Sequence, residues 1–292
     1  MKSRWLLNLG LLVIVLGLGA FLYFHPKQEQ QAEKSYELCD LKLSSFSNIQ
    51  IDFPAKASVS FEKKEGFWYI KQPFSARADQ IAVQRLMSIV AAKSTSKFPA
   101  NDLTRFGLDQ PKLKLKLDNE EFLFGTFNPV TSEQYVAYKG NVYLLSSSYS
   151  ESAQMQVSEF IDKNPMRPKE EIVGFDFSNL EQWQDVRLNV DLVDGKWKAS
   201  TEKAKPNQNE MNEWFDAYWR NMSVQEVEQY TPDHKATYPS FEVKLKDGKK
   251  VHFDKIQEAP ELLLGRPDEG LLYHVANDIG FNLLNPPVNM GK

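Results

Sequence analysis

Four histidines are the first candidates for metal or acid–base chemistry in this chain: His25, His234, His252 and His274. A metal site needs several such side chains, or carboxylates, at spacings that let them converge. No two of these histidines lie at a ligand spacing. His252 and His274 belong to the same half of the chain and could approach each other, but surface or partly buried positions explain both more simply. We therefore expect no metal ligands.

Nucleophilic catalysis is the next possibility, and its candidates are the run Ser146–Ser148 and the single cysteine, Cys39. The serines precede an expected helix, where hydroxyls commonly cap backbone N–H groups. The sequence has no Gly-x-Ser-x-Gly elbow and no glycine-rich phosphate loop. One cysteine cannot form an intrachain disulfide. The paired carboxylates Glu120-Glu121 and Glu170-Glu171 lie at turns or linkers, and nothing places them in one pocket. We expect no catalytic residues, no cofactor and no enzymatic activity.

Aromatic side chains are concentrated on one expected helix, from about Gln208 to Met222. Its large side chains are Trp214, Phe215, Tyr218, Trp219 and Met222. They cover more than a narrow helical stripe, so one edge of the helix could stay exposed. They could fill the core of the second half of the chain, or form a sticky edge for a protein partner or a glycan. The matching helix of the first half carries alanines instead, which makes Trp214, Tyr218 and Trp219 the candidate partner-binding residues.

Two stretches of the chain carry the same pattern, a proline followed by a strand of alternating apolar residues. They run from Gln110 to Asp118 and from Tyr238 to Asp247. Further matched pairs surround them in the same order: Trp68 and Trp197, Gly125 and Gly265, and Tyr143 and Tyr273. Self-similarity of this kind is typical of a repeated folding unit. We predict two related units, each long enough to bury its own core.

Turn signals between the strand patterns favour hairpins over β-helix-β crossovers. Lys139-Gly140, Asp194-Gly195 and Asp247-Gly248 each separate two strand-like runs. The predicted fold class is α+β, with an N-terminal transmembrane helix followed by two duplicated, mainly antiparallel β-sheet units that each carry packed helices. The expected segments are a membrane anchor (1–24), a linker (25–45), a first unit (46–163), a linker (164–170), a second unit (171–285) and a tail (286–292).

The apolar run from Trp5 to Phe24 predicts an uncleaved membrane anchor. It is interrupted by one polar residue, Asn8, and is long enough to cross the hydrocarbon core of a bilayer. A cleaved secretory signal is the alternative, but its apolar core is normally shorter. Lys2, Arg4 and the terminal amine favour a cytoplasmic N-terminus. We therefore expect a single-pass protein of the bacterial inner membrane, with residues 5–24 in the lipid and the C-terminal domain in the periplasm.

The overall charge argues against nucleic-acid binding. The formal net charge is -4 at pH 7, so the protein has no long-range field that attracts polyanions. The lysines that alternate with leucines over residues 112–117 fit one solvated face of a strand. We expect no nucleic-acid partner.

Several short motifs of the first unit recur in a known family. They are Gly66-Phe67-Trp68, Pro73, Ala78-Asp79-Gln80, Phe106-Gly107-Leu108-Asp109-Gln110-Pro111, Phe124-Gly125, Tyr135-Val136 and Val142-Tyr143-Leu144. In this order the run from Phe67 to Tyr149 resembles the domain-of-unknown-function family numbered 4340. The second unit resembles it only through the repeat. The resemblance implies a membrane-anchored extracytoplasmic protein, often encoded near ABC transporter subunits of the gliding-motility type. No catalytic residues are established for such proteins, so the resemblance assigns none here.

These observations favour a binding function over a catalytic one. The leading hypothesis is an accessory subunit of an ABC-transporter-like membrane complex, whose partner is a permease or a related membrane protein. Hairpin-rich folds offer sheet edges for such partners. The alternative is a cell-wall module that binds peptidoglycan, which the tryptophan and tyrosine content motivates. A hydrolase is the least favoured class, since it would need a convergent pocket of histidine and carboxylate side chains.

Overall fold

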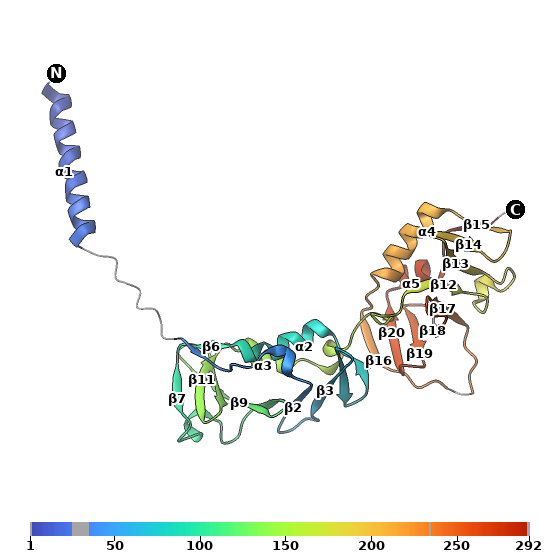
Figure 1. Ribbon diagram of the computed structural model, residues 1–292, viewed down its shortest axis with the longest axis horizontal. Coiled ribbons are helices and arrows are strands. Elements are labelled where there is room, and N and C mark those ends of the chain that lie inside the picture. The colour runs from blue at the N-terminus through green and yellow to red at the C-terminus, as the bar shows by residue number, and fades with distance from the viewer. Residues whose placement is uncertain (1, 25–34, 234, 291–292) are drawn as a thin grey trace.

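The alternating apolar residues of the first half form one antiparallel sheet in the computed structural model, which describes residues 2–24, 35–233 and 235–290 (Figure 1). Residues 25–34 of the expected linker, and with them His25, lie outside the described residues, as does His234. In the described part of this half, nine strands lie in the order β5-β4-β3-β2-β8-β9-β10-β11-β7. Their bounds are β2 (Asn48–Asp52), β3 (Val59–Lys64), β4 (Phe67–Gln72), β5 (Ala76–Arg77), β7 (Lys97–Pro99), β8 (Leu113–Leu117), β9 (Glu120–Phe127), β10 (Gln134–Tyr138) and β11 (Asn141–Leu145).

The second half forms its own antiparallel sheet. Within residues 172–275, residue 234 aside, eight strands lie in the order β14-β13-β12-β17-β18-β19-β20-β16. Their bounds are β12 (Ile172–Asp176), β13 (Asn189–Val193), β14 (Lys196–Ala199), β16 (Glu226–Gln229), β17 (Ser240–Leu245), β18 (Lys250–Gln257), β19 (Leu262–Arg266) and β20 (Leu271–Val275). Two short pairs lie apart from these sheets: β1 (Tyr36–Glu37) with β6 (Lys93–Ser94), and β15 (Ala204–Pro206) with β21 (Val288–Met290).

The two sheets share one strand order. The series β4-β3-β2-β8-β9-β10-β11-β7 has the counterpart β14-β13-β12-β17-β18-β19-β20-β16. Trp68 and Trp197 hold the same place in it. The main-chain N–H of Trp68 donates to Gln80 Oε1 at 2.9 Å, and that of Trp197 donates to Gln208 Oε1 at 2.7 Å. In both units the glutamine opens the next helix, so it ties that helix to the sheet.

One expected correspondence is wrong. Tyr143 on β11 and Tyr273 on β20 do occupy matching strands. Gly125, however, lies on β9, whereas Gly265 lies on β19, and these strands differ in their position in the shared order. The match in strand order concerns topology, and the duplication itself stays a prediction.

Short helices pack on the sheets and occur at two places in each unit, after the Trp-bearing strand and after β11 or β20. In the first unit they are α2 (Gln80–Met87), η2 (Ser88–Ala91), α3 (Ser148–Ala153) and η4 (Val157–Phe160); in the second they are α4 (Gln208–Trp214), the π-helix η6 (Phe215–Arg220) and α5 (Asn277–Leu284). Single 3-10 turns lie at η1 (Leu43–Ser45), η3 (Thr104–Phe106) and η5 (Glu181–Trp183). Asp79 caps α2, because its carboxylate accepts the N–H groups of Ile81 and Ala82. The mixed architecture is α+β with mainly antiparallel sheets, as predicted.

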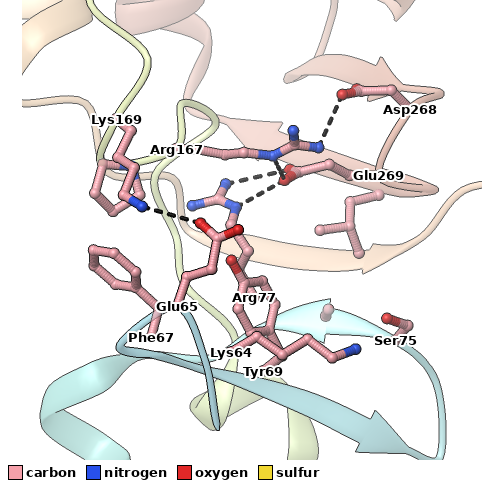
Figure 2. A pocket seen from close by; sticks show the side chains of 13 residues that line it. Lys64, Glu65, Phe67, Tyr69, Ser75, Arg77, Arg167, Lys169, Asp268 and Glu269 are labelled. Atoms are coloured by element: carbon pink, nitrogen blue, oxygen red, sulfur yellow. Dashed lines mark hydrogen bonds and ion pairs between the residues drawn. The ribbon is translucent and has the colours of Figure 1, made fainter. Parts of the chain in front are cut away.

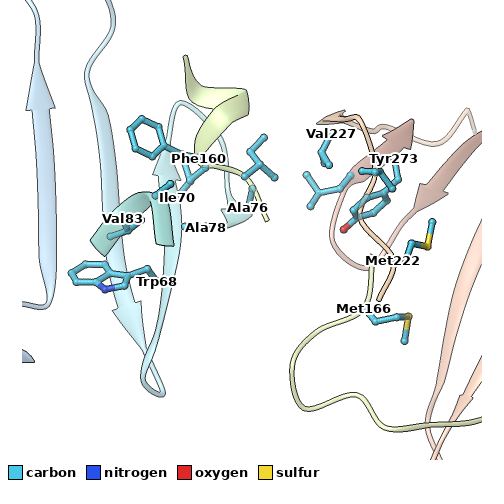
Figure 3. Close-up of a cluster of buried hydrophobic side chains, with 14 of the residues drawn as sticks. Trp68, Ile70, Ala76, Ala78, Val83, Phe160, Met166, Met222, Val227 and Tyr273 are labelled. Atoms are coloured by element: carbon cyan, nitrogen blue, oxygen red, sulfur yellow. The ribbon is translucent and has the colours of Figure 1, made fainter. Parts of the chain in front are cut away.

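Buried side chains of both units belong to one cluster (Figure 3). Ile70, Ala76 and Phe160 supply the side of the first unit, and Met222, Val227 and Tyr273 supply the side of the second. Met166, from the segment between the units, is part of the same cluster. Because apolar burial is the main stabilising term in folding, a cluster of this kind couples the two units.

The first helix, α1 (Lys2–Phe24), covers the N-terminal apolar run (Figure 1). Within the described part of the chain, no helix combines the length and the apolar character that a membrane crossing requires. The anchor expected over residues 1–24 is therefore not confirmed.

Candidate functional site

The segment between the units joins their sheet edges through main-chain hydrogen bonds. Asp79 N donates to Phe160 O at 2.7 Å, and Asp162 N donates to Arg77 O at 2.9 Å. Val224 N, just before β16, donates to Lys163 O at 3.0 Å. The chain over residues 160–163 thus extends the β5 edge of the first sheet and also contacts the start of the β16 edge of the second. The segment 164–170, expected as a linker, continues directly from this shared edge.

Arg77 on β5 is the central side chain of this junction. Its side chain is only 6% exposed, and it reaches Glu269, whose side chain is 7% exposed. Nε donates to Glu269 Oε1 at 2.9 Å, and Nη2 donates to Glu269 Oε2 at 3.3 Å. Nη1 pairs with Asp162, and Nη2 donates to the Tyr273 hydroxyl at 3.3 Å. A guanidinium has five N–H groups in a fixed plane, and this geometry suits bonds to both units at once.

Arg77 also binds the connecting segment itself, so that its N–H groups are shared among several acceptors. Nη2 donates to the carbonyl of Asn164 at 2.5 Å, and Nη1 donates to that of Met166 at 3.3 Å. One buried side chain thereby holds the first unit, the connection and the second unit. Removing it would leave carbonyl and carboxylate oxygens unpaired in a dry environment, which costs more than the bonds add.

Two more arginines complete the junction. Arg266, on β19, is fully buried; it donates to Pro165 O at 2.6 Å and to Glu170 Oε1 at 2.7 Å. Arg167 Nε donates to Glu269 Oε1 at 2.7 Å, so that carboxylate receives two arginines (Figure 2). Ion pairs and hydrogen bonds thus connect these side chains into one network, which we call the ionic junction. It consists of Arg77, Asp162, Arg167, Glu170, Arg266, Asp268, Glu269 and Tyr273.

Burial and the neighbouring charges shift the pKa values of three groups in the ionic junction. Burial acts to raise the pKa of the Glu269 carboxyl, but the charges of Arg77 and Arg266 outweigh burial and hold that pKa below its usual value. Burial raises the pKa of Asp162 by more than the Arg77 charge lowers it. Burial also raises the pKa of the Tyr273 hydroxyl. Each of these groups is already hydrogen-bonded, so using one as a general base would require breaking the junction.

A cleft of about 430 Å³ opens beside the ionic junction (Figure 2). Phe67 and Tyr69 of β4 line one wall, and Arg167 lines the other. Across the rim, Lys169 Nζ bonds Glu65 Oε2 at 3.0 Å. Polar and aromatic walls with mutually neutralised charges can bind a polar chain. Several of the charged groups there are engaged with one another: Arg77 and Arg167 pair with Glu269, and Arg167 also pairs with Asp268.

The three predicted partner-binding residues take different positions. Trp214 and Trp219 are buried, with 4% and 1% of their surface exposed, and only Tyr218 is half-buried. Core packing, the other interpretation of these aromatics, therefore accounts for both tryptophans. Their rings contact Phe175 on β12, at centroid distances of 5.2 Å for Trp214 and 4.7 Å for Trp219.

The indole N–H groups of three tryptophans donate hydrogen bonds to the C-terminal end of α5. Trp214, Trp219 and Trp183 donate to the carbonyls of Asn282, Leu283 and Leu284 at 2.6, 3.3 and 2.9 Å. Asn285 Nδ2 donates to the carbonyl of Phe281 at 2.7 Å. The last four carbonyls of a helix lack partners within the helix, so these side chains satisfy all four. The tryptophans are thus required by the core and by the end of α5.

The two histidines that the structure describes each pair with nearby carboxylates. His274 lies between Glu261 and Glu228, with ring nitrogens at 3.0 and 3.1 Å from their carboxylates, while His252 pairs with Asp254 at 3.1 Å. Among the described residues, no group of three or more histidine, cysteine or acidic side chains is arranged to hold a metal ion. Cys39 Sγ accepts the Tyr138 hydroxyl at 3.3 Å.

Sequence reasoning missed the residues of the ionic junction. Arg266 follows Leu262-Leu263-Leu264-Gly265, an apolar strand in which a charged residue is unexpected. Arg77 lies between Ala76 and Ala78 and gives a similar signal. A charge at a position whose neighbours are buried requires a paired charge elsewhere, and this rule could have singled out both arginines. Their partners, which lie far away in the chain, could not be assigned this way.

Comparison with known proteins gives a family and no function. The family model described as a domain of unknown function (DUF4340) matches residues 68–240. The match begins on β4, crosses the ionic junction and ends at the start of β17, so it extends further than the first-unit motifs indicated. No curated protein and no solved structure matches the chain. The matched segment covers more than half of the sequence, and the chain belongs to the DUF4340 family.

Proposed function

We propose that the protein is a non-enzymatic binding subunit of a membrane complex, in which two sheet units act as one body and receive a protein partner in the cleft between them. The observation that carries this proposal is the ionic junction. Its central charges, Arg77, Glu269 and Arg266, are buried and paired with one another, which suits a structural role rather than a turnover site. The cleft beside it has aromatic walls and a charged rim, as protein-binding surfaces commonly do.

The context of this proposal comes from the sequence. The apolar run over residues 5–24 motivates attachment to the bacterial inner membrane, with the sheet units in the periplasm. An ABC-type permease or a related subunit is the partner that the family resemblance favours. We also propose that the two units derive from one duplicated unit, which the shared strand order supports. A fusion of alkaline phosphatase after Lys292 tests the location, and an inactive fusion would overturn it.

Photo-crosslinking from the cleft tests the function itself. A benzophenone amino acid replaces Glu65 at the rim of the cleft in the full chain, and in a matched control it replaces Asp194 at an exposed turn of the second unit. After irradiation of native membranes, we expect position 65 to give an adduct that mass spectrometry identifies as a transporter permease or ATPase. The control should give none.

Two outcomes would contradict the proposal. Equal labelling from positions 65 and 194 would show that the cleft has no preferred partner. An adduct with peptidoglycan at position 65 would favour the glycan-binding alternative instead. Replacing Trp219 by alanine would not discriminate between protein binding and glycan binding, because Trp219 is buried and its loss perturbs the fold.

A further inference from the structure

A second surface, on the helices of the second unit, has the features of a docking site. A hollow of about 370 Å³ lies between α4, η6 and the end of α5. Its apolar lining consists of Trp214, Ala217, Tyr218 and Pro287. On α5, Phe281 is 62% exposed and lies one turn before Asn285, which also lines the hollow. The hollow is separate from the inter-unit cleft, and it shares no residue with that cleft.

The unpaired charges around this hollow are negative. Glu210 and Glu213 line it and are exposed, and Asp278 on α5 is exposed near Phe281 in the sequence. None of these three carboxylates forms an ion pair with a residue that the structure describes. Asp216 is paired internally, with Arg220 at 2.8 Å. The rim is therefore negative, and it would attract a cationic segment.

The backbone beneath the hollow is unusual. The chain from Phe215 to Arg220 is a π-helix, a conformation that is rare and occurs often at functional positions. Trp214 precedes this stretch and Trp219 lies within it, and both bond the end of α5, while Tyr218 between them is half-buried. An apolar floor, a negative rim and a widened helical turn therefore coincide here.

We propose that this surface, formed by α4, η6 and α5, docks a short basic segment of a partner protein, with one large apolar side chain seated in the hollow and flanking lysines or arginines on the rim. Phe281 extends the apolar contact along α5. Glu210 and Glu213 supply the charge complementarity. This binding does not depend on the cleft, so it can hold or fail independently of the proposed function.

Fluorescence anisotropy with defined peptides tests this inference. The protein is the full chain in non-ionic detergent, and the probe is a labelled pentapeptide with a central leucine flanked by two lysines on each side. One comparison peptide replaces the lysines by glutamates, and another replaces the leucine by alanine. Detergent without protein gives the background. We expect the lysine–leucine peptide to bind, both comparison peptides to bind at least fivefold more weakly, and added salt to weaken binding.

Matched variants locate the site. Glu213→Lys should weaken binding about fivefold, corresponding to roughly 1 kcal/mol for reversing one exposed charge. Its control is Glu151→Lys, which reverses an exposed helical acid of the first unit and should leave binding unchanged. Phe281→Ser should weaken binding similarly, and Ile81→Ser, which removes an apolar side chain that is 68% exposed on α2, should not.

Each possible result either supports the proposed docking site or overturns it. Equal binding of the lysine and glutamate peptides would overturn the charge argument, and with it the proposal. Equal losses in the site variants and in their controls would place the binding elsewhere and would also overturn it. A site-specific loss with unchanged circular dichroism of the variants supports the proposal.

Discussion

Replacing Arg77 by methionine removes the charge at the centre of the ionic junction while keeping much of the volume of the side chain. The substitution deletes the pairs with Glu269 and Asp162 and the bonds to the carbonyls of Asn164 and Met166. Loss of one partner of a buried ion pair costs about 3 to 5 kcal/mol, because the other charge stays buried without compensation.

The expected loss lies at the lower end of that range. Glu269 keeps Arg167 at 2.7 Å and the Tyr273 hydroxyl at 2.8 Å, so its carboxylate is not left bare. We expect about 3 kcal/mol. Asp162 has no ion pair other than Arg77 among the described residues, so its carboxylate is the charge left unmatched. Adding Asp162→Asn removes that charge, and the double variant should recover about 1 to 2 kcal/mol relative to Arg77→Met.

Urea unfolding followed by tryptophan fluorescence measures the free energy of unfolding of both variants, since each unit contains tryptophan (Trp68 in the first and Trp197 in the second). Loss of coupling should also split the transition into two, because two uncoupled units no longer unfold together. The control is Lys169→Met, which removes the Lys169–Glu65 pair at the rim of the neighbouring cleft. That pair is 67% and 82% exposed, and its loss should have little effect.

Equal destabilisation by Arg77→Met and Lys169→Met would refute the reasoning, since burial is what distinguishes the two pairs. A single transition for Arg77→Met that superimposes on the wild-type curve would refute it as well. In that case the apolar cluster around Met166 alone would hold the units together.

Three further predictions concern other parts of the chain. Trp219→Phe should keep most of the ring packing but leave the carbonyl of Leu283 without its donor, and we expect urea denaturation to show a loss of about 1 to 3 kcal/mol; an unchanged midpoint would contradict this role. His274 lies between two glutamates, and although burial lowers its pKa, their hydrogen bonds and charges raise it above the usual value. Its contribution to stability should thus be complete below about pH 6.5 and disappear as the pH rises through the folded-state pKa; a pH series in urea should show this decline in the wild type and not in His274→Gln, and identical profiles would contradict it. Gly125→Ala should destabilise the first unit, because the added Cβ would lie 2.3 Å from the carbonyl of Phe106; a thermal melt equal to that of the wild type would show that the loop can move away.

The strands could be predicted from the sequence because their signals are local. Alternation at Leu113, Leu115 and Leu117 places three side chains on the buried face of β8. The turn at Asp247-Gly248 joins β17 to β18, as its type predicts. These features depend on a few neighbouring residues, and the α+β class follows from them.

The contacts of the aromatic helix depend on residues far away in the sequence. The helix expected from about Gln208 to Met222 begins at Gln208 and ends at Arg220 in the structure. The surroundings of Trp214 and Trp219, however, depend on α5, which lies more than 60 residues further along the chain. The hydrophobic pattern could not show that α5 ends with four carbonyls in need of donors. Only the packed structure brings those carbonyls to the indole rings.

The ionic junction escaped prediction for a related reason. Arg77 and Glu269 are separated by 192 positions. The apolar neighbours of Arg77 show that it needs a paired charge, but nothing local identifies Glu269 as that partner. The prolines and polar residues of the segment 164–170 are typical of an exposed connection, which is why the sequence predicts a linker there. In the structure its carbonyls accept from two buried arginines, so the connection is part of the junction.

The distance distribution between the two units tests this account most directly. Spin labels at Gln84 on α2 and Lys198 on β14, both exposed, would be attached to the full chain carrying Cys39→Ser, and pulsed electron spin resonance would measure their separation. We predict one narrow distribution for this chain and a broad one after Arg77→Met. A broad distribution in the chain with Arg77 intact would contradict the claim that the ionic junction holds both units as one body.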